Sequence, residues 1–336
     1  MTKKYDYIII GQGIAGSAFA WNLYFNNRSF LIIDSKEKNS ASEAALGIYN
    51  PITGRRNSLT WNADKLFKTT EEFYYKVEKI LEQKFIYKKN IFRPFKNNRD
   101  LNDWNIRLEN SKFKKYIKKL DDKGVLTSKS GYLDVPKYLT ETRKYFKSQD
   151  RYIKKRITSK NINTGKSRIM INDYNAKNII MCMGINQKKL DLFSYLPLRP
   201  VSGNSITVEA DFKTKNIINN RISVINTSKN NLYAGSTYHN GFENMGTDKV
   251  ENQLKKIIKK KYKIKQYKFG IRPATRDRRP FVGRHPKFNN LFILNGLGSK
   301  GVSQSPHCSK ELLNYIELNK NLDKEINIER IKNVGE

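Results

Sequence analysis

The sequence predicts a mixed α/β fold (α+β, two-domain), in which a domain with a parallel sheet is interrupted by a second domain with an antiparallel sheet. Two observations predict the parallel sheet. Continuous apolar runs, typical of strands buried on both faces, lie near both ends of the chain at 5–10 and 290–295, and a helical pattern follows each of them. The third observation is a series of shorter strand-like runs between residues 196 and 237, separated by turn residues.

Length and composition indicate a large folded protein in a reducing compartment. The 336 residues exceed what one small core needs, and 12% of them are aromatic although only 38% are hydrophobic. The two cysteines, Cys182 and Cys308, are too few for a disulfide framework, so we expect a cytoplasmic protein. No run of eighteen apolar residues exists, and glycines interrupt the apolar N-terminal stretch, so we expect neither a membrane span nor a signal peptide.

The net charge of +34, from 65 basic and 31 acidic residues, allows two interpretations. An excess of this size is typical of proteins that bind nucleic acid or another anionic surface. It is also typical of a composition bias, because Lys, Asn, Ile and Tyr are abundant throughout. The lysines are spread over many segments rather than gathered on one predicted face, which favours the compositional interpretation and leaves the other open.

The first 34 residues have the order of a Rossmann-type unit. The strand 5–10 leads directly into "GQGIAG" at 11–16, a helical pattern follows over 17–27, and a second strand at 29–34 ends in Asp34. A G-x-G-x-x-G motif alone is weak evidence, but here the strand, the turn, the helix and the terminal acid are all in register.

Each residue type in this unit has a physical reason. Gly11 permits the tight turn, Gly13 lets the backbone approach a pyrophosphate, and Gly16 lets the helix pack closely on the strand. The helix N-terminus offers unpaired N–H groups to phosphates, and Asp34 can accept hydrogen bonds from ribose hydroxyls. The sequence therefore predicts dinucleotide binding, with these residues as contacts: Gly11, Gly13, Ile14, Ala15, Gly16 and Asp34.

The segment after the second strand favours FAD over NAD. A nicotinamide dehydrogenase of this length would continue with alternating strands and helices, whereas residues 35–56 form a loop rich in Ser, Ala and Gly. Such a loop can wrap around a longer cofactor with its N–H and hydroxyl groups, and we expect Ser42 and Ala45 to contact FAD.

The remaining chain predicts a cofactor domain that is discontinuous in sequence. We expect helices over 59–84, 100–120, 136–146 and 248–261, a strand or hairpin over 85–95, and a buried strand over 176–186 that ends at Gly184. Residues 151–157 and 167–173 alternate like strands. The expected division is 1–60, 130–200 and 275–336 for the FAD-binding domain, and 61–129 and 201–274 for the substrate domain.

These motifs together resemble the D-amino acid oxidase superfamily of flavoproteins, in particular its glycine oxidase-like members. The resemblance runs in order through nearly the whole chain. It is most specific in "IIIGQGIAGSAFA" and "FGIRPATRDRRPFVGRHPKFNNLFILNGLGSKGV", and loose over 60–130. It implies non-covalent FAD and oxidation of the C–N bond of an amine or amino acid by hydride transfer, which yields an imine. Molecular oxygen or another acceptor would then take the electrons, giving hydrogen peroxide in the case of oxygen.

The resemblance implies roles for two cationic residues. The arginine of "G-[IL]-R-P" in the family binds the substrate carboxylate, and here it is Arg272. The alternative is a structural arginine paired with Asp277. Lys300 lies in the turn before the last helix, where it either supplies a charge beside the flavin or is one of many exposed lysines. The other arginines of this stretch, Arg276, Arg278, Arg279 and Arg284, are expected at the surface or in local pairs.

The turn at 295–306 resembles the family's contact with the pyrimidine end of the flavin. Its glycines let N–H groups approach the ring, and the following helix directs its positive end there. The expected contacts are Gly184, Gly296, Gly298, Ser299, Gly301 and Val302. Tyr49, Tyr233 and Tyr238 either line the pocket or belong to the core. The three histidines have no metal spacing, so no metal site is expected.

The segment 47–67 departs from the glycine oxidase pattern, and its Arg55, Arg56 and Trp61 either shape a different entrance or bind a larger anionic substrate. The pocket tyrosine of glycine oxidase has no recognisable counterpart in this sequence, which leaves glycine in doubt as substrate. Two other functions stay open. The C-terminal motifs also resemble the oxidase half of a tRNA-modifying enzyme that acts on a carboxymethylaminomethyl wobble uridine, for which the basic charge would be useful. The third hypothesis is a flavoprotein kept only as a binding module.

Overall fold

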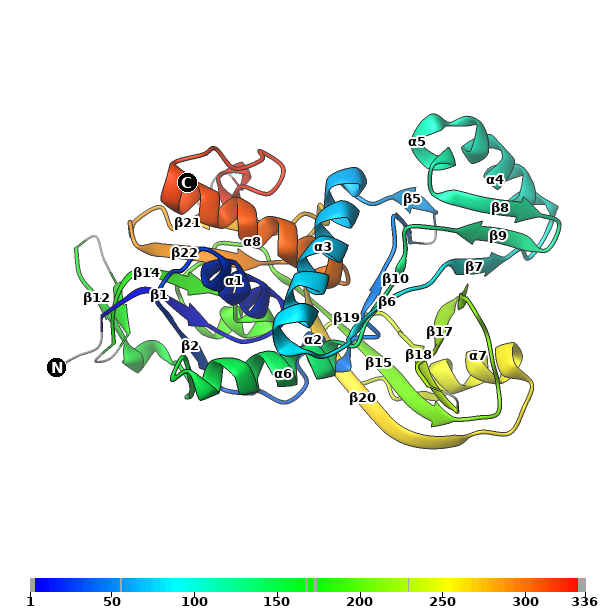
Figure 1. The fold of residues 1–336 in the computed structure, drawn as a ribbon, viewed down its shortest axis with the longest axis horizontal. Coiled ribbons are helices and arrows are strands. Elements are labelled where there is room, and N and C mark those ends of the chain that lie inside the picture. The colour runs from blue at the N-terminus through cyan, green and yellow to red at the C-terminus, as the bar shows by residue number, and fades with distance from the viewer. Residues whose placement is uncertain (1–3, 55, 167–168, 172–173, 229, 332–336) are drawn as a thin grey trace.

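The computed structural model describes residues 4–54, 56–166, 169–171, 174–228 and 230–331, and it confirms the mixed α/β fold (Figure 1). A sheet dominated by parallel strands lies at one end of the molecule, and a larger, mainly antiparallel sheet lies at the other. The first and last described residues, Lys4 and Ile331, lie on the side of the parallel sheet.

The parallel sheet has six strands and two buried faces. Along the five parallel strands, residues alternate between the faces: Ile9 and Ile32 belong to one core, whereas Ile8 and Ile33 belong to the other. The edge strand β21 runs antiparallel to its neighbour. The strands, in spatial order, are β11 (Tyr152–Lys154), β2 (Phe30–Asp34), β1 (Lys4–Ile10), β14 (Asn175–Met181), β22 (Leu291–Asn295) and β21 (Phe281–Arg284).

The helices that share the core on one face of this sheet are α1 (Ile14–Phe25), α3 (Ala63–Leu81), α6 (Val135–Ser148) and α8 (Gly301–Leu318). The opposite face is covered by the hairpin of β12 (Ile162–Thr164) and β13 (Ile169–Ile171) and by apolar residues of the segment 185–198. No helix of the described ranges is long and apolar enough to cross a membrane.

The second sheet has nine strands and two different faces. Alternate residues of its strands, such as Ile206, Val224 and Ala234, pack against α7 (Asp248–Ile258). The other face is turned toward the cofactor domain. The strands are β19 (His239–Asn240), β15 (Arg199–Glu209), β18 (Asn231–Gly235), β17 (Ile222–Asn226), β16 (Ile217–Asn220), β7 (Ile91–Pro94), β9 (Gly124–Thr127) and β8 (Ile117–Asp121), with β20 (Lys263–Ala274) paired to β15.

Short elements connect the two sheets. A three-stranded sheet pairs β10 with β3 and β6, and its Tyr132 packs with Tyr233 of the large sheet. The remaining elements are α2 (Ala41–Ala44), β3 (Ile48–Tyr49), β4 (Ile52–Thr53), β5 (Ser58–Leu59), β6 (Ile86–Lys88), α4 (Asn98–Glu109), α5 (Ser111–Lys114) and β10 (Gly131–Leu133). Short 3-10 helices lie at Ser159–Asn161, Gly184–Lys189 and Ile328–Arg330.

The structure corrects two expectations for the middle of the chain. The helix expected over 100–120 is wrong at its end, because Asn110 caps the short α5 and residues 117–121 form β8, which pairs with β9. The strand or hairpin expected over 85–95 is instead two strands in different sheets, because β6 pairs with β10 and β7 pairs with β9.

The helix α3 lies in the range expected for the substrate domain, but it packs on α8, where Tyr74 donates to Val302 O at 3.1 Å. We therefore propose a domain boundary after α3.

Candidate active site

The glycine turns predicted from sequence follow three neighbouring parallel strands, β1, β14 and β22. Their carboxyl ends lie at the point where the chain order of the sheet reverses, which is where open α/β sheets bind ligands. Gly11 has φ +100°, and a Cβ there would lie 2.6 Å from Cys182 O, so only glycine fits between the two turns. Asn295 Nδ2 donates to Gly184 O at 2.9 Å, which joins the second turn to the third.

The first turn presents the N-terminus of α1. A Cβ on Gly16 would lie 1.9 Å from Gly11 O, so the helix packs directly on the turn. Gly13 is the N-cap and offers no side-chain hydrogen bond, while the N–H of Ile14 donates to Ser42 Oγ at 3.1 Å. Ala15 is buried in the first helical turn. Because Gly13 has no side chain, this positive helix end is suited to a phosphate.

Asp34 is held at the end of β2 by backbone donors. Its Oδ1 accepts from Gln12 N at 2.9 Å and its Oδ2 accepts from Lys36 N at 3.0 Å. A carboxylate can accept about four hydrogen bonds, so these two contacts orient the group and leave lone pairs for ribose hydroxyls.

The loop from 39 to 45 lies between the two sheets. Ile271 N donates to Asn39 O at 3.2 Å, and Ser205 Oγ donates to Ala44 O at 2.9 Å. Ser42 and Ala45 therefore lie on a segment anchored to the substrate sheet on one side and to the α1 N-terminus on the other. This position is compatible with a loop that wraps around the cofactor, which stays a prediction.

The third turn brings the N-terminus of α8 beside that of α1. A Cβ on Gly301 would lie 2.8 Å from Ile14 Cγ2, so the two helix ends are in contact. Gly296 and Gly298 have φ +73° and +53°, and Gly298 N donates to Pro273 O at 3.0 Å, next to Arg272. Of the other expected contacts here, Val302 is buried and Ser299 is exposed.

Lys300 is the N-cap residue of α8 and is half-buried. Burial lowers the pKa of Lys300 to about 8, and the nearby charges of Arg278 and Arg279 contribute to this lowering. No carboxylate oxygen of the described residues lies within 4.0 Å of its ammonium group. Lys300 is therefore a half-buried lysine with a lowered pKa and is not one of the exposed lysines.

Arg272 is held by neutral groups only. Its Nη1 donates to Ser202 O at 3.3 Å and Thr237 O at 3.2 Å, and its Nη2 donates to Ser236 Oγ at 2.8 Å. The Tyr238 ring lies over the guanidinium, 4.3 Å from Cζ to the ring centroid. Burial lowers the pKa of Arg272 from its ordinary value.

The expected alternative, a pair between Arg272 and Asp277, is wrong. Asp277 instead accepts from Arg330 Nε at 2.9 Å. Within the described ranges, no carboxylate oxygen lies within 4.0 Å of the Arg272 guanidinium. A desolvated cation without a counter-charge is costly, so this geometry favours an anionic ligand at Arg272.

The sequence analysis missed the groups that orient Arg272. Ser236 and Thr237 are part of the weak motif "LYAGSTY", and only strand pairing brings them to Arg272. Of the tyrosines considered for the pocket, Tyr238 covers Arg272 and Tyr233 is half-buried on the same sheet face. Tyr49 belongs to the core, with its hydroxyl 3.2 Å from Glu71 Oε1.

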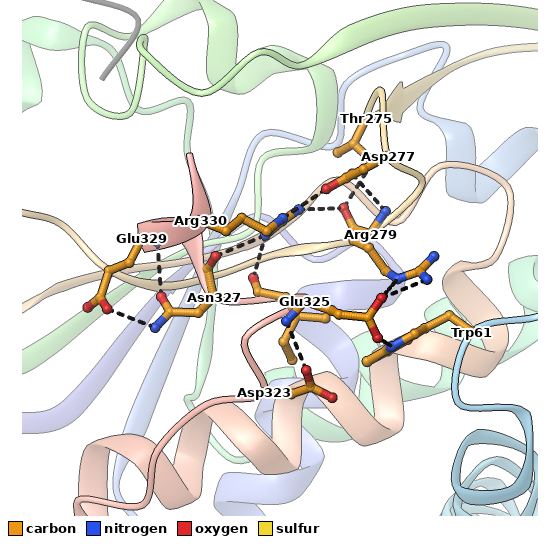
Figure 2. A network of polar contacts seen from close by, with 10 residues as sticks. Trp61, Thr275, Asp277, Arg279, Asp323, Glu325, Asn327, Glu329 and Arg330 are labelled. Atoms are coloured by element: carbon orange, nitrogen blue, oxygen red, sulfur yellow. Dashed lines mark hydrogen bonds and ion pairs between the residues drawn. The ribbon is translucent and has the colours of Figure 1, made fainter. Parts of the chain in front are cut away.

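The other arginines of 272–284 form local contacts, as expected for this stretch. Figure 2 shows Arg279, whose Nε and Nη2 donate to Glu325 Oε1 at 3.0 and 2.8 Å, while Trp61 Nε1 donates to the other oxygen of Glu325. Arg278 and Arg276 are exposed, and Arg284 lies over Phe292. Arg56 is exposed, and Arg55 lies outside the described residues.

The network of Figure 2 joins the loop after β20 to the C-terminal segment 323–330. We expect Glu325→Gln and Arg279→Met each to lower the free energy of unfolding by about 0.5–1 kcal/mol, since the pair is partly exposed. In the double variant the losses should not add. Thermal unfolding of the four proteins measures this coupling, and fully additive losses would show that the ion pair contributes nothing.

The residues at the three turns fit FAD. The cradle between α1, α8 and the 39–45 loop is lined by glycines at positions where a Cβ would collide, and Asp34 stands at its ribose end. Buried polar atoms without a partner, Gln12 Oε1 and Gln304 Nε2, belong to the first and third turns. The fold and the site thus define a dinucleotide-binding protein in which a half-buried arginine, without a carboxylate partner among the described residues, lies next to the third turn.

The chain belongs to the DAO family of FAD-dependent oxidoreductases, whose model matches residues 6–314. Solved structures confirm the fold. Glycine oxidase from Geobacillus kaustophilus superposes with a TM-score of 0.80 at 17% identity, over 96% of this chain and 97% of that one. Iminodiacetate oxidase from Chelativorans sp. BNC1 gives 0.79 at 17%, over 95% and 97%. L-proline dehydrogenase from P. horikoshii gives 0.74 at 13%, over 96% and 95%.

Proposed function

We propose that this FAD-dependent oxidoreductase oxidises the C–N bond of a small amine that carries a carboxylate, such as an amino acid or an N-substituted glycine. The observation that carries the proposal is Arg272, a half-buried guanidinium without a carboxylate partner among the described residues, one residue from the backbone contact between Pro273 O and Gly298 N. The structural neighbours named above support it, because each is named for a substrate that has both an amine nitrogen and a carboxylate.

In this proposal the protein binds FAD and the substrate and orients them relative to each other. FAD, when bound, supplies the hydride acceptor, so few side chains need to react. Arg272 holds the substrate carboxylate in its planar fork and thereby fixes the position of the adjacent C–H bond. The glycine turns and Asp34 hold the cofactor, and the sheet face around Arg272 excludes water.

Anaerobic bleaching of the flavin absorbance tests the proposal. Glycine, sarcosine, proline, D-amino acids and tRNA carrying carboxymethylaminomethyl uridine are added in turn to the purified FAD-loaded protein. Bleaching by a small amino acid is the expected result, and reoxidation by oxygen would identify an oxidase. Bleaching only by the modified tRNA would instead establish the tRNA-modifying alternative. Flavin that no amine bleaches would support the binding-module hypothesis and contradict the proposal.

We expect the charge of Lys300 to assist the reaction below pH 8. Its ammonium form, present below its pKa of about 8 and lost above it, favours the negative charge that develops at the cofactor. The ratio of bleaching rates, wild type over Lys300→Met, should therefore fall as the pH rises through about 8. Ionisation of the substrate amine affects both proteins equally and therefore does not change the ratio. A ratio that is independent of pH would exclude a role for the Lys300 charge in the reaction.

A further inference from the structure

Lys268 is a second half-buried cation on the sheet face that carries Arg272. The two residues are four positions apart on β20, so their side chains point to the same side. Their partners on β15 are Ser205 for Lys268 and Val201 for Arg272. The hydrogen bond from Ser205 Oγ to Ala44 O shows that this face is turned toward the cofactor loop rather than toward α7.

Lys268 forms no ion pair with a described residue. No carboxylate oxygen among them lies within 4.0 Å of Nζ, which instead lies 4.8 Å from the ring centroid of Tyr233. Burial lowers the pKa of Lys268, and the more distant Asp134 and Glu43 only partly oppose this. On the same strand, Lys265 shows the ordinary arrangement, an exposed lysine paired with Glu209 Oε2 at 2.5 Å.

A packing role explains the position of Arg93, another half-buried arginine, but it does not explain the position of Lys268. Arg93 donates to Asn57 Oδ1 at 2.8 Å and to Ile52 O at 2.7 Å, so it ties the β4–β5 hairpin to the sheet. Lys268 makes no hydrogen bond to a described residue, and a cation–π contact offsets only part of the cost of burying an ammonium group.

The two cations are too far apart to bind one small anion together. Four residues of strand separate their Cα atoms by about 13 Å. Between them lies Gly270, where a Cβ would be 2.7 Å from Ala44 Cβ, so the cofactor loop covers the strand at this point. A ligand that reaches both cations must therefore pass around this loop and carry two anionic groups on separate arms.

We propose that Lys268 binds a second anionic group of the substrate, a carboxylate or phosphate on the arm opposite the carboxylate held by Arg272. The inference rests on the proposed function and narrows its substrate class to amines with two well-separated anionic groups. Lys268 then determines specificity and takes no part in the oxidation itself.

Binding of simple carboxylates to the FAD-loaded protein tests the inference without any oxidation. Aliphatic dicarboxylates of increasing length are compared with monocarboxylates of equal length, by calorimetry or by perturbation of the flavin absorbance. We expect the best dicarboxylate to bind about tenfold or more tightly than its monocarboxylate. Lys268→Met should remove this advantage and leave monocarboxylate binding unchanged, and Lys268→Arg should keep it.

Lys265→Met is the matched control and should change neither affinity. The inference would be overturned if no dicarboxylate, at any length, bound more tightly than its monocarboxylate. The absence of binding by both kinds of compound would overturn it as well. So would an advantage that persists in Lys268→Met. Failure of the proposed function is a separate result, because it appears as flavin that no amine bleaches. That result does not depend on the affinities measured for the dicarboxylates.

Discussion

Replacing Arg272 with alanine is expected to lower kcat/KM for a carboxylate-bearing amine by roughly 30- to 1,000-fold, as loss of one partner of a buried charge pair does. Arg272→Lys keeps the charge but not the two-pronged fork, so we expect an intermediate loss. The measurement is the rate of anaerobic flavin bleaching over a range of substrate concentrations. Folding should be retained, because the variant removes a buried cation that has no counter-charge among the described residues of the free protein.

Two controls separate carboxylate binding from a structural role. Arg276→Ala removes an exposed arginine four residues further along the chain and should leave kcat/KM unchanged. An amine substrate without a carboxylate should lose little activity in Arg272→Ala. If both kinds of substrate lose activity equally, Arg272 supports the fold of the pocket and does not recognise the carboxylate.

Gly16→Ala is expected to abolish FAD binding and to lower the free energy of unfolding by about 3 kcal/mol or more, since a Cβ would lie 1.9 Å from Gly11 O. The neighbouring atom is backbone and cannot rotate away, so α1 must move off the turn. That movement displaces the helix N-terminus from the cofactor phosphates. Flavin released on denaturation and chemical unfolding of the FAD-free protein measure the two effects separately.

Gly54→Ala is the matched control for this substitution. Gly54 has φ +76°, but a Cβ added there would meet no described atom within 4 Å beyond its chain neighbours, so the variant introduces backbone strain without a collision. We expect a loss of about 1–2 kcal/mol and full FAD content. Full FAD content in Gly16→Ala as well would contradict the close helix packing that the glycine motif predicts.

Local patterns predicted the turns after the parallel strands, while the contacts of single residues with FAD stay predictions. The glycines of the first turn, Asp34 and the turn before α8 were recognisable because strand, turn and helix each have a short-range signature. Arg272 was identified only through the family resemblance. The end of the 100–120 segment was predicted wrongly because pairing with β9, a long-range contact, outweighs the helical pattern of residues 117–121.

The sequence by itself determined the strand–turn–helix order at both ends of the chain and the glycine turns that we propose hold FAD, because these depend on neighbours a few residues away. Only the tertiary structure decided that Arg272 has no acidic partner among the described residues and that Ser236 and Thr237 hold it. It alone placed Lys268 on the same inward face without an ion-pair partner among the described residues. Whether a charged side chain is paired depends on segments far apart in the chain, and no local pattern records which of them meet.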